Sequence, residues 1–150
     1  MNASDIMMKN VITVSPDLEI HKLAELFVEK NISGAPVILS GKVVGLVLED
    51  DLIVRDRKVH LPTFVFLLSG LVTLGEKKLE QDLKKIAAST VKDIMRKKIS
   101  QISPNTDIES IAALVVDKGI NYFLVMENDS LIGVITKKDL VKAISENKIF

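Results

Sequence analysis

The chain repeats itself, and this repeat limits the possible fold more than any other feature of the sequence. Residues 5–53 align without gaps onto residues 93–141 at an offset of 88, and 16 of the 49 pairs are identical. Many of the remaining pairs exchange one apolar residue for another, such as Leu23 for Ile111 and Val44 for Ile132. Self-similarity at a fixed offset is the signature of a duplicated structural unit. The chain therefore contains two copies of one framework.

Each copy is predicted to begin with a short helical lead-in, followed by a strand, a helix, two more strands and a last helix. The lead-ins are Ser4–Met8 and Val91–Met95, and the first strands are Val11–Val14 and Ile99–Ile102. A Ser-Pro pair follows each first strand and is expected to end it, because proline favours a turn or a helix start.

Apolar residues then recur at the i, i+3, i+4, i+7 spacing that buries one face of a helix. They are Ile20, Leu23, Ala24 and Phe27 in the first copy and Ile108, Ile111, Ala112 and Val115 in the second. Thr106 and Glu109 have the spacing of a capping box at the start of the second helix. Leu18 occupies the position of Thr106 in the first copy, which leaves Asp17 or Ser15 as the expected cap.

Two short apolar runs joined by a tight turn follow in each copy and predict a β-hairpin. The runs are Ala35–Leu39 with Val43–Leu48 and Phe123–Glu127 with Leu131–Thr136, across the turns Ser40-Gly41-Lys42 and Asn128-Asp129-Ser130. The closing helix is predicted to begin near Glu49 in the first copy and near Lys137 in the second.

The second hairpin runs directly into its closing helix at Thr136, and Asp139 lies three residues further on. A strand-to-helix junction exposes free N–H groups and the positive end of the helix dipole, which suit a phosphate or a sugar. Thr136 and Asp139 also have the spacing of a capping box, in which each side chain accepts a hydrogen bond from the other residue's amide. The residues alone leave both interpretations open.

The ordered motifs of the two copies resemble the CBS motif, named after cystathionine beta-synthase, which occurs in tandem pairs. The motifs are Asp-Ile-Met at the start, Ser-Pro after the first strand, Gly34-Ala35-Pro36-Val37, and Gly-x-x-x-x-x-Asp-Leu at the end. The second copy departs from this pattern at Tyr122-Phe123-Leu124-Val125. The resemblance implies an α+β fold in which two β-α-β-β-α units with pseudo-two-fold symmetry pack through their sheets.

The same resemblance implies a binding cleft between the motifs for an adenosine-containing ligand, such as AMP, ADP, ATP or S-adenosylmethionine. In CBS pairs the motif Gly-hydrophobic-x-Thr/Ser-x-x-Asp lines this cleft, which implies that Asp139 holds the ribose and Thr136 lies near the phosphate. In the first copy Asp51 matches the motif, but Leu48 replaces the hydroxyl residue. The expected ligand-binding residues are Thr136, Asp139, Lys137, Lys138, Ser100, Tyr122, Leu124, Asp51, Ala35 and Pro36.

The chemistry of such a ligand is consistent with the residues around this motif. The amides and side chains of Lys137 and Lys138, or the side chains of Arg55 and Arg57, could bind the phosphate. Strand ends near Ile99–Gln101 and Tyr122–Val125 could flank the adenine. Tyr122 could stack on the base or fill the pocket, and the sequence does not choose between the two.

Composition excludes several other functions. Twenty Lys and Arg balance twenty Asp and Glu, so nucleic acid is not expected as a partner despite the basic runs Arg55-Asp56-Arg57-Lys58 and Arg96-Lys97-Lys98. The absence of cysteine excludes disulfides and thiolate catalysis, and with the lack of a secretory signal it favours a cytoplasmic protein. No catalytic or metal-binding motif is complete, so neither an enzyme nor a required cofactor is predicted.

The predicted domain boundaries are residues 1–53 for the first motif, 54–90 for a spacer and 91–150 for the second motif. In the spacer, Val59–Gly75 is apolar but short and interrupted for a membrane span, so no membrane partner is expected. Glu76–Ala88 is predicted to form an amphipathic helix. We expect the apolar run to be covered by the rest of the fold or by a second chain in a homodimer.

The predicted function is regulatory sensing of an adenosine ligand, with the signal passed to an effector protein that the sequence does not identify. The alternative is a ligand-free dimerisation scaffold, which Leu48 and the bulky Tyr122-Phe123 pair favour.

Overall fold

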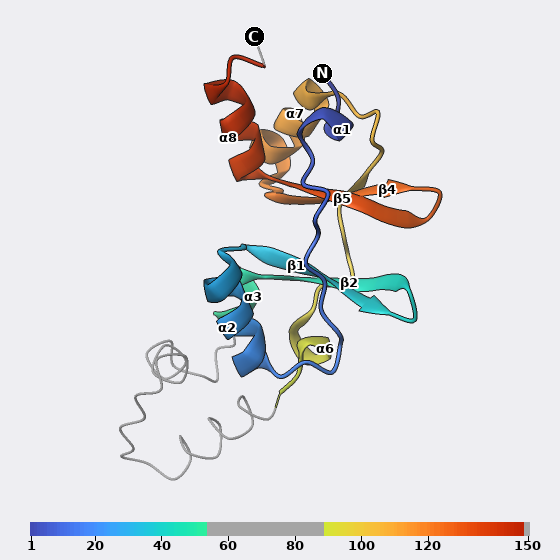
Figure 1. The fold of residues 1–150 in the computed structure, drawn as a ribbon, viewed down its shortest axis with the longest axis vertical. Helices are drawn as coiled ribbons and strands as arrows, with labels where there is room; N and C mark the ends of the chain where they lie inside the picture. The colour runs from blue at the N-terminus through green and yellow to red at the C-terminus, as the bar shows by residue number, and fades with distance from the viewer. Residues whose placement is uncertain (54–88, 149–150) are drawn as a thin grey trace. The chain divides into compact units, whose positions relative to one another are not determined.

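The computed structural model describes residues 1–53 and 89–148 (Figure 1). The predicted apolar run Val59–Gly75, the predicted helix Glu76–Ala88 and the proposed phosphate donors Arg55 and Arg57 lie outside the described residues. Helices and antiparallel hairpins are mixed along the described chain, which confirms the predicted α+β class.

Every element of the first copy begins 88 residues before its counterpart, so the repeat predicted from the sequence is confirmed. The first copy forms α1 (Ala3–Ile6), α2 (Ile20–Lys30), β1 (Gly34–Leu39), β2 (Lys42–Leu48) and α3 (Glu49–Leu52). The second copy forms α6 (Val91–Ile94), β3 (Gln101–Ile102), α7 (Ile108–Lys118), β4 (Tyr122–Glu127), β5 (Ser130–Thr136) and α8 (Lys137–Ser145).

The two hairpins, β1–β2 and β4–β5, are antiparallel and carry the same irregularity. The register shifts just after Val37 in the first hairpin and just after Val125 in the second. Both turns have two consecutive residues with positive φ, namely Ser40 (51°) with Gly41 (77°) and Asn128 (48°) with Asp129 (63°). Such turns follow the right-handed twist of the strands. Both predicted hairpins are therefore confirmed.

The first strand is present only in the second copy. There β3 runs parallel to β4, and the Leu124 amide donates to the Ser100 carbonyl at 3.0 Å. The counterpart of Leu124 is Pro36, which has no N–H to donate. Only an isolated bridge between Val14 and Val37 remains in the first copy, so the predicted strand Val11–Val14 is wrong.

The caps of the long helices also differ from the prediction. Asp107 caps α7 and accepts from the Ser110 amide at 2.8 Å, while the Thr106 hydroxyl accepts from the Ser103 amide at 3.1 Å. In the first copy α2 starts after Glu19 without a side-chain cap bond. The predicted caps were wrong because Thr106 and Ser15 instead accept from nearby amides outside the helices, those of Ser103 and Asp17.

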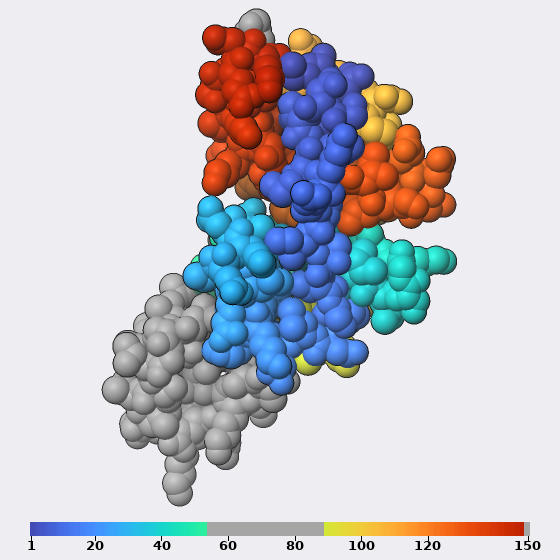
Figure 2. Space-filling model, viewed as in Figure 1, coloured from blue at the N-terminus to red at the C-terminus, as the bar shows by residue number. Residues whose placement is uncertain are grey.

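The chain forms two compact units, and each unit takes its lead-in helix from the other repeat. Unit 1 comprises residues 1–12 and 98–150, and unit 2 comprises residues 13–97. In unit 1 the Ala3 amide of α1 donates to the Thr106 carbonyl at 2.8 Å. In unit 2 the Val91 amide of α6 donates in the same way to the Leu18 carbonyl at 2.9 Å. Figure 1 shows α1 beside α7 and α8, and Figure 2 shows its dark-blue residues against the red residues of α8.

Each unit has its own hydrophobic core, made by its helices and one face of its hairpin. Ala3 and Val91, one from each lead-in, are fully buried in these cores. The buried core of unit 2 is Val14, Ile20, Leu23, Phe27, Ala35, Val37, Val47, Leu52 and Val91. That of unit 1 is Ala3, Ile108, Ile111, Phe123, Val125, Ile135 and Leu140.

Glycine allows the residue after each lead-in to pack closely on the hairpin. A Cβ on Gly133 would lie 2.6 Å from the Sδ of Met7, and one on Gly45 would lie 2.6 Å from the Sδ of Met95. These distances are far below van der Waals contact, so both positions exclude a side chain. The identical Gly and Met residues of the two copies are therefore explained by the same contact.

Candidate ligand-binding site

The junction of β5 and α8 holds the residue pair that the sequence analysis selected. Thr136 is the last residue of β5 and the N-cap of α8. The Oδ2 atom of Asp139 accepts one hydrogen bond from the Thr136 amide and one from the Thr136 hydroxyl, each 2.7 Å long. The carboxylate therefore reaches back to the cap amide as a capping box requires. Both side chains are half-buried.

The same carboxylate-to-cap bond opens all three other short helices of the described chain. Asp5, Asp51 and Asp93 each accept from the amide three residues earlier, at 2.8, 2.9 and 2.8 Å. The bond by itself is therefore a local structural device. What distinguishes the individual sites is the set of side chains around each carboxylate.

Tyr122 lies next to the Thr136–Asp139 pair. It is the first residue of β4 and pairs with Thr136 across the hairpin. Its side chain is buried, and burial together with the negative charge of Asp139 raises the pKa of the phenol above its ordinary value. The phenol and the carboxylate therefore interact electrostatically.

Ser100 and Leu124 meet at the parallel pairing of β3 with β4. Leu124 is fully buried but is not part of the unit 1 core that Phe123 and Val125 form. Since side chains alternate along a strand, Leu124 faces the other side of the sheet, as does Tyr122. Ser100, Tyr122 and Leu124 all lie in unit 1, as do Thr136 and Asp139.

Two lysines occupy the first turn of α8 immediately after Thr136. Lys137 and Lys138 are exposed. The amide of Lys137 donates to the Asn121 carbonyl at 3.2 Å, so this amide is already used within the fold. The cationic side chains and the positive end of the helix dipole remain as electrostatic attractions for an anion.

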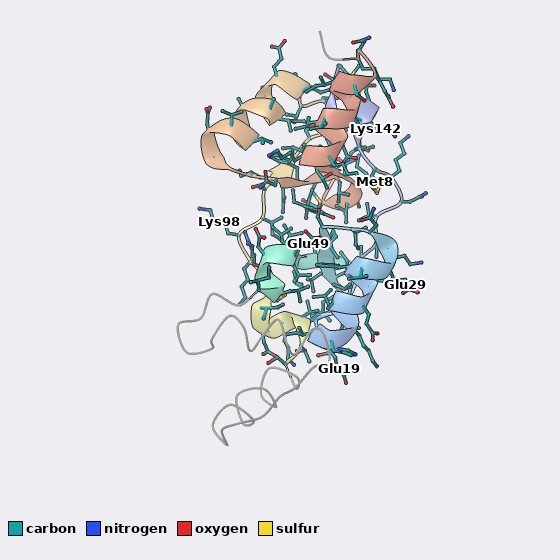
Figure 3. All side chains as sticks on the ribbon, turned by 90° about the vertical axis from the view of Figure 1, so that its left-hand side faces the viewer. Met8, Glu19, Glu29, Glu49, Lys98 and Lys142 are labelled. Carbon is teal, nitrogen blue, oxygen red and sulfur yellow. The ribbon has the colours of Figure 1, made fainter. Side chains whose placement is uncertain are left out.

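The equivalent junction in unit 2 has different chemistry. Asp51 accepts from the Leu48 amide, and Leu48 has no hydroxyl to add a second bond. The Nε of Arg96 lies 2.8 Å from Oδ1 and 3.1 Å from Oδ2 of Asp51, in an ion pair in which the carboxylate is only 13% exposed. Glu49 and Asp50 stand where the second copy has lysines. Figure 3 labels Glu49 at the start of α3.

Ala35 and Pro36, the other two expected residues of this unit, lie on β1. Ala35 is part of the unit 2 core, whereas Pro36 is buried outside that set. Their side chains therefore point to opposite faces of the strand.

Arg96 is a functional candidate that was not predicted from the sequence. It was noted only as part of the basic run Arg96-Lys97-Lys98. Its counterpart at the offset of 88 is Met8, and both follow an identical Asp-Ile-Met segment. A change from an apolar to a charged residue within a matched segment is the signal that could have indicated it.

Within residues 1–53 and 89–148, no group of three His, Asp or Glu side chains is arranged to bind a metal ion. No helix in these ranges has the length and apolar character needed to cross a membrane.

The chain belongs to the CBS domain family. The CBS domain model matches residues 3–57 and again residues 91–146, so it covers both copies of the repeat. The fold and the two Asp-containing junctions described above thus have the tandem arrangement of a CBS pair.

Curated relatives of the chain support this membership. The uncharacterized protein MJ1426 of Methanocaldococcus jannaschii is 32% identical over 92% of this chain and 88% of its own length. The zinc metalloprotease MJ0392 of the same organism is 26% identical over 97% of this chain, which spans only 32% of that protein. An inosine-5'-monophosphate dehydrogenase of Korarchaeum cryptofilum is 28% identical over 80% of this chain, which spans 24% of the enzyme.

Solved CBS structures share the fold. The CBS-pair protein CBSX2 from Arabidopsis thaliana superposes with a TM-score of 0.71 at 24% identity and covers 98% of this chain and 96% of its own. A second structure of CBSX2 is a complex with AMP, with the same TM-score and 99% of both chains covered. At this identity the likeness establishes the fold alone.

Proposed function

We propose that this protein is a regulatory module that binds an adenosine nucleotide at the junction of β5 and α8, with AMP as the first candidate. The observation that carries the proposal is the bonded pair of Thr136 and Asp139 at the start of α8. The CBS resemblance implies ribose and phosphate contacts for these two positions, and CBSX2, which has the same fold, binds AMP in its crystal structure.

The carboxylate of Asp139 has the capacity that a ribose diol needs. Its Oδ2 atom accepts two hydrogen bonds from Thr136. A carboxylate oxygen has two lone pairs, so Asp139 can accept from both ribose hydroxyls while the cap bond remains. Hydrogen bonds to a charged acceptor are about twice as strong as neutral ones.

The phosphate of the ligand is assigned to the first turn of α8. The Lys137 amide is engaged by Asn121 and the Thr136 hydroxyl donates to Asp139, so the donors in this proposal are the two lysine side chains and the Lys138 amide. The positive end of the helix dipole adds to this attraction.

We also propose that the module senses a ligand rather than catalysing a reaction, and that it regulates a partner protein. The relatives with enzyme names are much longer than this chain, which matches 32% of the metalloprotease and 24% of the dehydrogenase. A ligand that binds one packing of the module better than another would shift the population between them, and the partner would read this shift.

A homodimer formed through exposed helix faces is part of the same proposal. Val28 on α2 and Val116 on α7 occupy equivalent positions, and they are 83% and 82% exposed. Val141 and Ile144 on α8 are also exposed large apolar residues, one helical turn apart. We expect Val116→Glu to lower the sedimentation coefficient to that of a monomer, whereas Asp117→Ala on the same helix should leave it unchanged. A monomeric wild type would contradict the dimer.

The ligand proposal is tested by thermal unfolding with AMP, ADP, ATP and S-adenosylmethionine. A ligand at about 100 times its dissociation constant should stabilise the wild type by about 2.7 kcal/mol. The informative variant is Asp139→Asn, and its matched control is Asp93→Asn. Asp93 accepts the same bonds from Thr90 at the start of α6 but lies outside the proposed site.

Both substitutions weaken a cap, so both should lower the midpoint of the unliganded protein. Only Asp139→Asn should reduce the shift that the ligand produces, by about half or more. If no ligand shifts the wild type, or if both variants keep the shift, the pair is a cap alone and the scaffold function takes precedence.

A further inference from the structure

The two copies of the Asp junction contain the same carboxylate, but the charged residues around it differ. At Asp51 the neighbouring cation comes from the chain itself, because the Arg96 Nε contacts both carboxylate oxygens. Arg96 is held there by two backbone hydrogen bonds to Leu46 on β2, of 2.8 and 2.9 Å. These bonds fix the backbone from which the guanidinium extends.

At Asp139 the corresponding residue is Met8. Its backbone makes the same pair of hydrogen bonds, to Val134 on β5, at 2.9 and 3.1 Å. The thioether of Met8 carries no charge, and no ion pair to Asp139 is formed by a described residue. Figure 3 labels Met8 on the segment that follows α1. One residue in an otherwise equivalent backbone thus decides whether the carboxylate has a cationic partner.

The charge of the first helical turn after each junction also differs between the copies. Lys137 and Lys138 begin α8, whereas Glu49 and Asp50 begin α3 at the matching positions. Acidic side chains next to a phosphate repel it, and lysines attract it. The first copy also lacks the hydroxyl that donates to the carboxylate in the second, because Leu48 occupies the position of Thr136.

We infer that Arg96 acts as a built-in occupant of the first junction, so that each chain binds a single adenosine nucleotide, at Asp139 and not at Asp51. A ribose diol at Asp51 would compete with the guanidinium for both oxygens, and Glu49 and Asp50 would repel its phosphate. The inference rests on the proposed function of the Asp139 junction and adds its stoichiometry, which Arg96, Glu49 and Asp50 set together.

The experiment is isothermal titration of AMP into the full chain and three variants, with folding checked by circular dichroism. We expect one AMP per chain in the wild type. Asp51→Asn and Arg96→Met should keep that stoichiometry and an affinity within about threefold, because neither touches the occupied junction and Glu49 and Asp50 still repel a phosphate at the first one. Asp139→Asn should weaken binding by about tenfold or more.

The results distinguish a failure of this inference from a failure of the proposed function. Two AMP per chain in the wild type would overturn the inference while the proposed function stands, and so would a folded Asp51→Asn or Arg96→Met variant that loses binding. No binding by the wild type would overturn both. Arg96→Lys, which keeps a cation beside Asp51, replaces Arg96→Met if the latter does not fold.

Discussion

One oxygen of Asp139, Oδ2, accepts hydrogen bonds from both the amide and the hydroxyl of Thr136, each 2.7 Å long. This pair of bonds holds the carboxylate in one orientation at the start of α8. A binding group that is already ordered loses less conformational entropy when a ligand arrives. The structural cap therefore favours the proposed ribose contact, because it orders the carboxylate before the ligand binds.

Removing the Thr136 hydroxyl should affect both the cap and the ribose contact. We expect Thr136→Val to lower the free energy of unfolding by about 1 kcal/mol, because its hydrogen bond to Asp139 is lost, and to weaken AMP binding by about tenfold, because the carboxylate is then less well ordered. Thr136→Ser keeps the hydroxyl and should remain near wild type in both measurements. Urea unfolding and titration calorimetry give the two values. Equal AMP affinity in the valine and serine variants would contradict a role for the hydroxyl.

Alanine at Gly133 should destabilise unit 1 by about 1–3 kcal/mol, the usual cost of overpacking. The new methyl would lie 2.6 Å from Met7 Sδ and 3.1 Å from Met7 Cβ, so a rotation of the Met7 side chain cannot relieve the whole clash. Denaturant unfolding measures the loss. In the double variant with Met7→Ala the two losses should not add, because residues in contact are coupled. Strict additivity would show that the two residues do not meet.

The ion pair of Arg96 with Asp51 should appear as a coupling in a double-mutant cycle. The Arg96 side chain is 46% exposed, so we expect only about 0.5–1.5 kcal/mol from Arg96→Met, Asp51→Asn and the double variant. Solvent screening also predicts that the coupling falls as salt is added. A coupling near zero at low salt would mean that the pair does not form in solution.

Tyr122 is the only tyrosine of the chain, so tyrosinate absorbance reports this one group. Burial first and Asp139 second raise its pKa, and the folded protein therefore keeps the phenol proton above about pH 10, where an unfolded chain releases it. The free energy of unfolding should then fall as the pH rises above about 10, because the unfolded state binds fewer protons there.

The variant Asp139→Asn should lower the pKa of Tyr122 only in part, since burial is the larger cause. Absorbance titration of the folded protein measures both values. If Tyr122 titrated like a free tyrosine in the wild type, its burial beside Asp139 would be refuted.

The sequence predicted most where the signals are local. The β4–β5 hairpin was expected at Phe123–Glu127 and Leu131–Thr136, and it spans Tyr122–Glu127 and Ser130–Thr136. Alternating apolar residues and a tight turn are sufficient for such a prediction. The Asp139 bond to the Thr136 amide was equally predictable, because a capping box spans only four residues.

The predictions failed where the outcome depends on distant residues. Whether Val11–Val14 forms a strand depends on an N–H that Pro36 lacks, more than twenty residues later. The pairing of Arg96 with Asp51 joins residues 45 positions apart, and no periodicity relates them. Such contacts are set by the tertiary fold, which local propensity does not encode.

The exchange of lead-in helices constrains how a duplicated protein of this kind can have arisen. Ala3 of the first repeat completes the core built by the second, and Val91 of the second completes the core built by the first. A chain with a single repeat would lack a partner for its own lead-in. It could fill its core only by trading that segment with another molecule, as in a domain-swapped dimer. Gene duplication would then have converted an exchange between two chains into one within a single chain, removing its dependence on protein concentration.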